Sequence, residues 1–117
     1  MKNKGYLLLV AVLSTGCVTP QTQYHWGEYE SLLYQMYANP SEATPELQIQ
    51  QLTQDKQEAE AAGKPIAPGI NAHMGMMHAA MGNLEAAIAA FEEEKLRYPE
   101  SKQFMDDMID RAKGGKE

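Results

Sequence analysis

Apolar positions along the chain recur with the period of an α-helix in five segments, and no segment shows a competing strand pattern. Between residues 28 and 39, apolar side chains fall at i, i+3, i+4, i+7 and i+8: Tyr29, Leu32, Leu33, Met36 and Tyr37. This spacing places them on one face of a helix. The same reasoning predicts helices over residues 44–62, 68–81, 84–98 and 101–112.

Capping and turn residues mark the ends of these segments. Thr44 can cap the second helix with its hydroxyl group, and Gly63 follows the last turn of that helix. Residues 82–83 turn the chain between the third and fourth helices, Pro99 ends the fourth, and Ser101 can cap the fifth. Because the last three helices are joined by short turns, the sequence predicts an all-α fold with antiparallel neighbours.

The last two helices each have an apolar face that we expect to be buried. In the fourth helix it consists of Leu84, Ala87, Ile88, Phe91 and the aliphatic stem of Lys95. In the fifth it consists of Phe104, Met105, Met108, Ile109 and Ala112. The acidic run at residues 92–94 is expected to form a solvated face, because successive side chains on a helix point about 100° apart.

Composition narrows the class of protein. The chain has 117 residues, with 10 Lys and Arg against 16 Asp and Glu, which gives a formal charge of −6 and suits one small globular domain. A chain with this excess of acidic residues does not offer the basic surface that nucleic-acid binding requires. A single cysteine also excludes a disulfide within the chain.

The first 17 residues have the layout of a secretory signal. Lys2 and Lys4 precede an apolar run over residues 6–13, and small residues at 14–16 precede Cys17. The apolar run is too short for a transmembrane helix, which needs roughly 20 residues. One interpretation is an ordinary cleaved signal that leaves Cys17 as a free thiol.

The segment also resembles a bacterial lipoprotein signal, with Ser14 in place of the usual leucine. The resemblance implies that the peptide is cut before Cys17, that this cysteine is acylated, and that several acyl chains hold the protein stably on a membrane. Similar lipoproteins are retained at the inner membrane mainly by an aspartate directly after the cysteine. The resemblance therefore implies that this chain, with Val18 at that position, lies on the periplasmic face of the outer membrane. We therefore expect a signal peptide at 1–16, a lipidated cysteine and tether at 17–25, a helical domain at 26–113 and a tail at 114–117.

Five residues in the third and fourth predicted helices have the spacing of a tetratricopeptide repeat: Gly75, Gly82, Ala87, Phe91 and Pro99. Small residues allow the two helices to approach closely, and Phe91 fills the space between them. The repeat is degenerate, because Asn71, His78 and Glu94 replace the usual tryptophan, tyrosine and alanine. No second copy is evident 34 residues upstream, so the flanking helices are expected to act as caps.

The chain resembles a family of small tetratricopeptide-like bacterial lipoproteins of uncharacterised function. The most specific features are the stretch FEEEKLRYPES and the motif Tyr-x-Trp-Gly-x-Tyr, formed by Tyr24, Trp26, Gly27 and Tyr29. Ala67 departs from a commoner proline. Such proteins tend to be encoded beside a curli-secretion-channel-like lipoprotein, which implies a shared cell-envelope assembly.

The sequence offers no catalytic motif, because phosphate loops, nucleophile elbows and zinc-binding helices are all missing from it. The stretch HMGMMHAAM places four potential copper(I) ligands within about 100° of helical arc, with His73 pointing elsewhere: Met74, Met77, His78 and Met81. The alternative is that this arc packs in the core, where methionine is a flexible filler.

These observations predict a non-enzymatic protein–protein interaction adaptor, without a cofactor, anchored to the outer membrane through Cys17. Its expected partners are other envelope lipoproteins, including a curli-secretion-channel-like protein, and its candidate contacts are Tyr24, Trp26, Tyr29 and Tyr34. At least half of these aromatic residues are expected to lie in the core. The alternatives are a periplasmic copper(I)-binding protein and a purely structural envelope lipoprotein.

Overall fold

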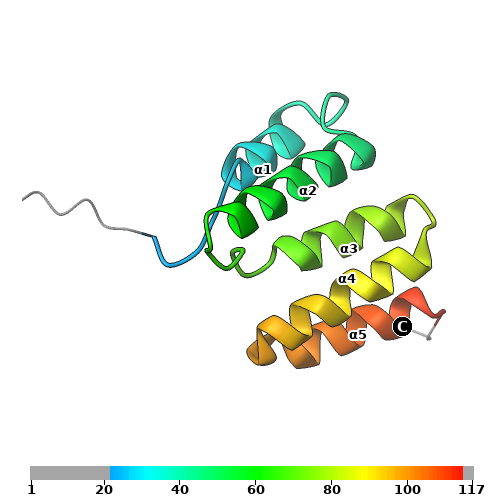
Figure 1. The fold of residues 1–117 in the computed structure, drawn as a ribbon. Helices are drawn as coiled ribbons and strands as arrows, with labels where there is room; N and C mark the ends of the chain where they lie inside the picture. The colour runs from blue at the N-terminus through cyan, green and yellow to red at the C-terminus, as the bar shows by residue number, and fades with distance from the viewer. Residues whose placement is uncertain (1–21, 115–117) are drawn as a thin grey trace, which may run out of the picture.

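The computed structural model describes residues 22–114 and has the all-α fold that the sequence predicts (Figure 1). The helices are α1 (Tyr29–Ala38), α2 (Pro45–Ala61), α3 (Ile70–Ala80), α4 (Leu84–Arg97) and α5 (Lys102–Ala112), with a 3₁₀ turn at Pro99–Ser101. No strand is present in the described part of the chain, and one isolated bridge joins His25 to Ile66. None of the described helices is both long enough and apolar enough to cross a membrane.

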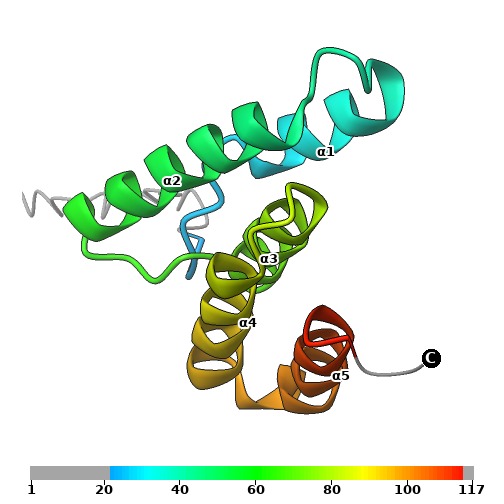
Figure 2. The same ribbon diagram turned by 90° about the vertical axis from the view of Figure 1, so that its right-hand side faces the viewer.

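Each helix packs against the next one along the chain. The views in Figure 1 and Figure 2 show this succession, from α1 at one end of the molecule to α5 at the other. The helices α1 and α2 form one helical hairpin, and α3 and α4 form a second. The helix α5 covers the second hairpin by packing against α4.

Local signals set the helix ends, with one difference from the prediction. The Thr44 hydroxyl accepts a hydrogen bond from the Leu47 amide at 3.4 Å, as expected of a cap. Ser101 precedes α5, but its hydroxyl donates to the Tyr98 carbonyl at 2.7 Å and makes no capping bond. The predicted Ser101 cap is therefore wrong, because the 3₁₀ turn directs this side chain back toward α4.

Two clusters of buried side chains form the core. The first core joins α1, α2, the loop after α2, and α3: Leu32, Leu52, Ala59, Ile66, Ala67, Ile70 and Met74. The second core joins α4 and α5, with α3 packed against it: Ala87, Phe91, Met105 and Ile109. Leu84 and Phe104 are 45% and 57% exposed, so their predicted burial is wrong. Leu84 is the first residue of α4, and Phe104 lies at the edge of the apolar face of α5.

The chain before α1 is part of the fold. The His25 amide donates to the Pro65 carbonyl at 2.8 Å, and the His25 carbonyl accepts from the Ala67 amide at 3.1 Å. The Tyr24 ring meets the Tyr98 ring edge-on, with centroids 6.0 Å apart. Tyr24 and His25, which were predicted to belong to the tether, are thus held against the loop after α2 and the end of α4.

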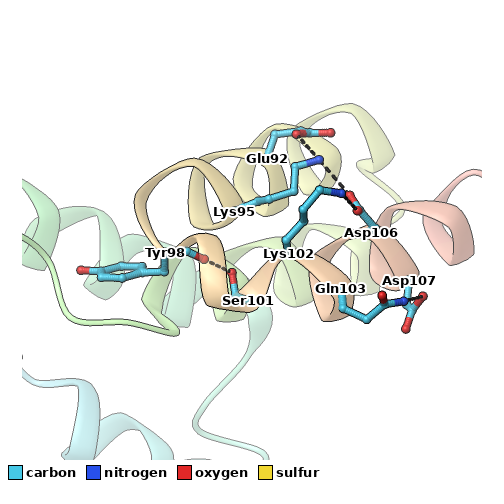
Figure 3. A network of polar contacts seen from close by, with 8 residues as sticks. All are labelled: Glu92, Lys95, Tyr98, Ser101, Lys102, Gln103, Asp106 and Asp107. Atoms are coloured by element: carbon cyan, nitrogen blue, oxygen red, sulfur yellow. Dashed lines mark hydrogen bonds and ion pairs between the residues drawn. The ribbon is translucent and has the colours of Figure 1, made fainter.

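A surface network of ion pairs fixes α5 to α4 (Figure 3). The Lys95 ammonium lies 2.9 Å from an Asp106 carboxylate oxygen and 2.7 Å from one of Glu92, and Asp106 also pairs with Lys102. Hydrogen bonds to Asp106 and Glu92 raise the pKa of Lys95, and those from Lys102 and Lys95 lower the pKa of Asp106. The Lys95–Asp106 pair is thus a surface contact between α4 and α5, whereas the second core is the buried contact between the same helices.

Candidate interaction surface

The Trp26–Gly27 turn that leads into α1 rests on a buried carboxylate. Asp55 on α2 is 1% exposed, and its oxygens accept hydrogen bonds from the Glu28 amide and the Gln51 side chain, both at 3.3 Å. Gly27 has φ +52°, and a Cβ atom there would lie 2.4 Å from Asp55 Cγ. This close approach explains why glycine follows tryptophan in the motif, because it leaves no room for a side chain at residue 27.

The turn places two aromatic rings side by side, and one of them contacts α3. Trp26 stacks on Tyr29 with centroids 6.5 Å apart and keeps 39% of its surface exposed. Tyr29 is half-buried and meets the His73 ring edge-on at 5.6 Å. Burial, with a smaller effect from the charge of Glu94, raises the pKa of Tyr29. Trp26 therefore packs on Tyr29 and keeps part of its surface in water.

Two further tyrosines project from α1 into solvent. Tyr34 and Tyr37 are 72% and 83% exposed, and residues three apart lie on the same side of a helix. Tyr37 shares the predicted apolar face of α1 with Leu32, Leu33 and Met36, but it stays exposed whereas those three residues are buried or half-buried. We call Trp26, Tyr34 and Tyr37 the aromatic surface.

The four predicted contact residues thus divide into two groups. Tyr24 and Tyr29 are half-buried against Tyr98 and His73, whereas Trp26 and Tyr34 remain open to solvent. Tyr37 was not among the predicted contacts. The signal that could have identified Tyr37 is its position three residues after Tyr34 on the same helix, at the edge of the apolar face.

A buried hydrogen-bonded chain lies beneath these rings. His73 is 6% exposed, and its Nε2 atom lies 2.7 Å from Gln48 Oε1, while Gln48 Nε2 donates to the Ala43 carbonyl at 2.6 Å. Because the Gln48 oxygen is an acceptor, His73 donates from Nε2. Burial lowers the pKa of His73, so the buried ring is neutral at neutral pH.

The residues with repeat spacing line the contact between α3 and α4. A Cβ atom at Gly75 would lie 2.4 Å from the ring of Phe91, so the two helices approach more closely there than alanine permits. Ala87 and Phe91 are almost fully buried. Gly82 turns the chain with φ +75°, and Pro99 begins the 3₁₀ turn after α4.

Glu94 belongs to the interior, so its predicted place in a solvated acidic face is wrong. The residue is 2% exposed, and its carboxylate accepts a hydrogen bond from the Gly69 amide at 2.7 Å at the start of α3. Burial raises the pKa of Glu94, and bonds from the amides of Gly69, Ala72 and Asn71 oppose that rise. The signal was its place in the repeat, where Glu94 occupies a position usually held by alanine.

The four proposed copper(I) ligands lie in different environments. Met74 belongs to the first core, Met77 and His78 are half-buried, and Met81 is 45% exposed. Within residues 22–114, no three His, Cys, Asp or Glu side chains come together as a metal-binding group. Cys17 and the signal peptide lie outside the described residues.

Comparisons with known proteins identify one family. The model of a domain of unknown function (DUF4810) matches residues 23–108, which includes all of α1 to α4 and most of α5. No curated protein matches the chain. No solved structure matches it.

Proposed function

The chain belongs to the family of the domain of unknown function DUF4810, and we propose that it is a lipid-anchored, non-enzymatic adaptor on the periplasmic face of the outer membrane. In this role it binds other envelope lipoproteins through the aromatic surface. The observation that carries the proposal is the exposure of three large aromatic side chains on and just before α1. Aromatic residues of this kind recur at the centres of protein–protein interfaces.

The anchor rests on Cys17 and the signal-like segment before it. Seven residue steps separate Cys17 from Tyr24, the first residue held by an aromatic contact in the fold. A fully extended chain of that length reaches about 25 Å. Lipid on Cys17 would therefore keep the aromatic surface close to the membrane, where other lipoproteins are anchored.

The tetratricopeptide-like interpretation is supported by the way both hairpins are built. In each, a glycine with positive φ precedes the first helix, and a buried acidic residue on the second helix accepts from a backbone amide there. Gly27 and Asp55 have these roles in the first hairpin, and Gly69 and Glu94 have them in the second. Stacked helical hairpins form extended surfaces that suit protein binding.

Photo-crosslinking in native membranes tests the adaptor proposal. A photoreactive amino acid replaces Tyr34 or Tyr37, and the matched control replaces Gln50, an exposed residue on α2. We expect positions 34 and 37 to give one common product with an envelope lipoprotein, such as the curli-secretion-channel-like protein. Position 50 should not give that product.

The same experiment separates the contribution of the anchor from that of the surface. A chain with Cys17→Ala and a soluble signal peptide should lose most of the product, because it no longer shares a membrane with its partner. Identical products from positions 34 and 50, or none from either tyrosine position, would contradict the adaptor role. The second result would leave a purely structural lipoprotein as the better account.

A further inference from the structure

A cleft of about 570 Å³ lies between α2, the loop after it, and the end of α4, and no residue of the aromatic surface lines it. These elements can be followed in Figure 2. The volume is in the range of sites that hold small organic ligands. Its lining combines three apolar side chains of the first core with polar and charged ones: Ala59, Ile66 and Met74, with Thr53, Lys56, Gln57, Glu60, Lys64 and Arg97.

Cations gather at this cleft although the chain as a whole is acidic. Lys56, Lys64 and Arg97 line it, whereas Glu60 is the one acidic residue in the lining. Residues 22–114 contain four other basic residues, and two of those, Lys95 and Lys102, pair with acids between α4 and α5. Three of the seven Lys and Arg residues in this part of the chain therefore lie at one cleft.

Two of the three cations are held in place by Glu93. Its carboxylate oxygens lie 2.7 Å from Lys56 Nζ and 3.0 Å from Arg97 Nε, and Lys56 Nζ also donates to Asn71 at 2.9 Å. Burial by itself would raise the pKa of Glu93, but the bonds and charges of Lys56 and Arg97 hold it below its usual value. Glu93 thus remains ionised and orients both cations.

Donors remain available after this network is formed. The bond to Glu93 uses Arg97 Nε, and the described residues provide no ion pair for the terminal nitrogens of Arg97 or for Lys64 Nζ. Lys64 comes from the loop and Arg97 from α4, so these donors come from two separate elements of the lining. A planar guanidinium and an ammonium group together suit a carboxylate or phosphate group.

We propose that this cleft binds a small amphipathic anion, with a carboxylate or phosphate group between Lys64 and Arg97 and a short apolar portion over Ile66 and Met74. The site does not depend on the adaptor role, because it involves none of the residues of the aromatic surface. Its two features predict a specific order of ligands. An anion with an apolar chain binds best, an anion without one binds more weakly, and a neutral alcohol of the same length does not bind measurably.

Titration calorimetry tests this order on the full chain carrying Cys17→Ser, which cannot be acylated at residue 17. The probes are octanoate, octyl phosphate, acetate, inorganic phosphate and octanol. We expect the two eight-carbon anions to bind with dissociation constants at roughly 1 mM or below, and at least about tenfold more tightly than acetate or inorganic phosphate. If inorganic phosphate binds as tightly as octyl phosphate, the site holds free anions and the apolar part of the proposal is wrong.

Lys64→Met tests the contribution of Lys64 to anion binding, since the described residues provide no ion pair that this substitution would break. We expect this substitution to weaken octanoate binding about tenfold, because it removes one charge-assisted contact. Lys113→Met at the end of α5 is the matched control, with unchanged affinity. Thermal unfolding of both variants shows that the fold is retained. Equal affinity of the wild type and Lys64→Met, equal binding of octanol and octanoate, or no saturable binding of octanoate would each overturn the proposal.

Discussion

Two features of the fold disfavour any side chain at residue 27, which is glycine. Its φ of +52° lies in the left-handed region, where a side chain is strained, and Asp55 Cγ occupies the space 2.4 Å from where a Cβ atom would lie. Gly63 has a similar φ of +63° but has nothing within 4 Å of that position. Comparison of the two glycines therefore separates the cost of backbone strain from the cost of the contact with Asp55.

We expect Gly63→Ala to lower the free energy of unfolding by about 1 kcal/mol, the cost of the left-handed conformation alone. Gly27→Ala should lower it by about 3 kcal/mol, because overpacking against a buried carboxylate adds to that strain. Urea denaturation followed by circular dichroism measures both values. Equal losses in the two variants would show that Asp55 moves aside at little cost.

His73 makes the stability of the fold depend on pH. Burial lowers its pKa from the usual 6.5, so the protonated form is less favourable in the folded chain than in the unfolded one. The stability from the neutral ring is fully present above pH 6.5, and it is lost as the pH falls through the folded value. We expect the free energy of unfolding to fall more between pH 7 and pH 5 in the wild type than in His73→Gln. The same slope in both would contradict this assignment.

The sequence could not reveal the burial of His73 and Glu94, because both depend on groups from other elements. His73 is held by Gln48 on α2, and Glu94 by backbone amides at the start of α3. Periodicity within one helix carries no information about such partners. The sequence did predict the buried positions of Ala87 and Phe91, because both are apolar and lie on the apolar face that helical spacing defines within α4.

At the scale of helices, local chemistry was sufficient to predict the elements. All five helices begin and end within about two residues of their predicted limits, because prolines, glycines and caps mark those ends. The first hairpin was not recognised as a counterpart of the second. The features that the two hairpins share are Gly27 with Gly69 and Asp55 with Glu94. Because the connections within the hairpins differ in length, these pairs do not recur at a spacing of 34 residues.

Close contact between α3 and α4 predicts an unusual effect of a small substitution. Alanine normally stabilises a helix relative to glycine by about 1 kcal/mol. Gly75→Ala should instead destabilise the protein by about 1–2 kcal/mol, because the new methyl group would overlap the buried ring of Phe91. Urea denaturation measures this change.

A double-mutant cycle identifies the cause of that loss. Phe91→Leu removes the ring atoms that lie nearest to residue 75, so the double variant should lose less stability than the sum of the two single variants. If the losses of stability in the two single variants simply add in the double variant, the strain does not come from contact between residue 75 and Phe91. Stabilisation by Gly75→Ala alone would show that the helices separate readily.

At the scale of the molecule, the two cores are connected through the α3–α4 hairpin. Ile70 and Met74 on α3 belong to the first core, and Ala72 and Ala79 on the same helix pack against the second. Ala90 on α4 also packs against the first core, although Phe91 belongs to the second. Loss of either core therefore removes support from the helices that the other core needs.

This connection predicts that the chain unfolds as one cooperative unit. Leu52→Ala in the first core and Ile109→Ala in the second should each lower the free energy of unfolding by about 3 kcal/mol, because both side chains are buried. Each variant should still show a single transition that coincides by circular dichroism and by Trp26 fluorescence. If Ile109→Ala separates the two signals, with helical content lost before Trp26 is released, the second core unfolds independently and the α3–α4 hairpin does not couple the two.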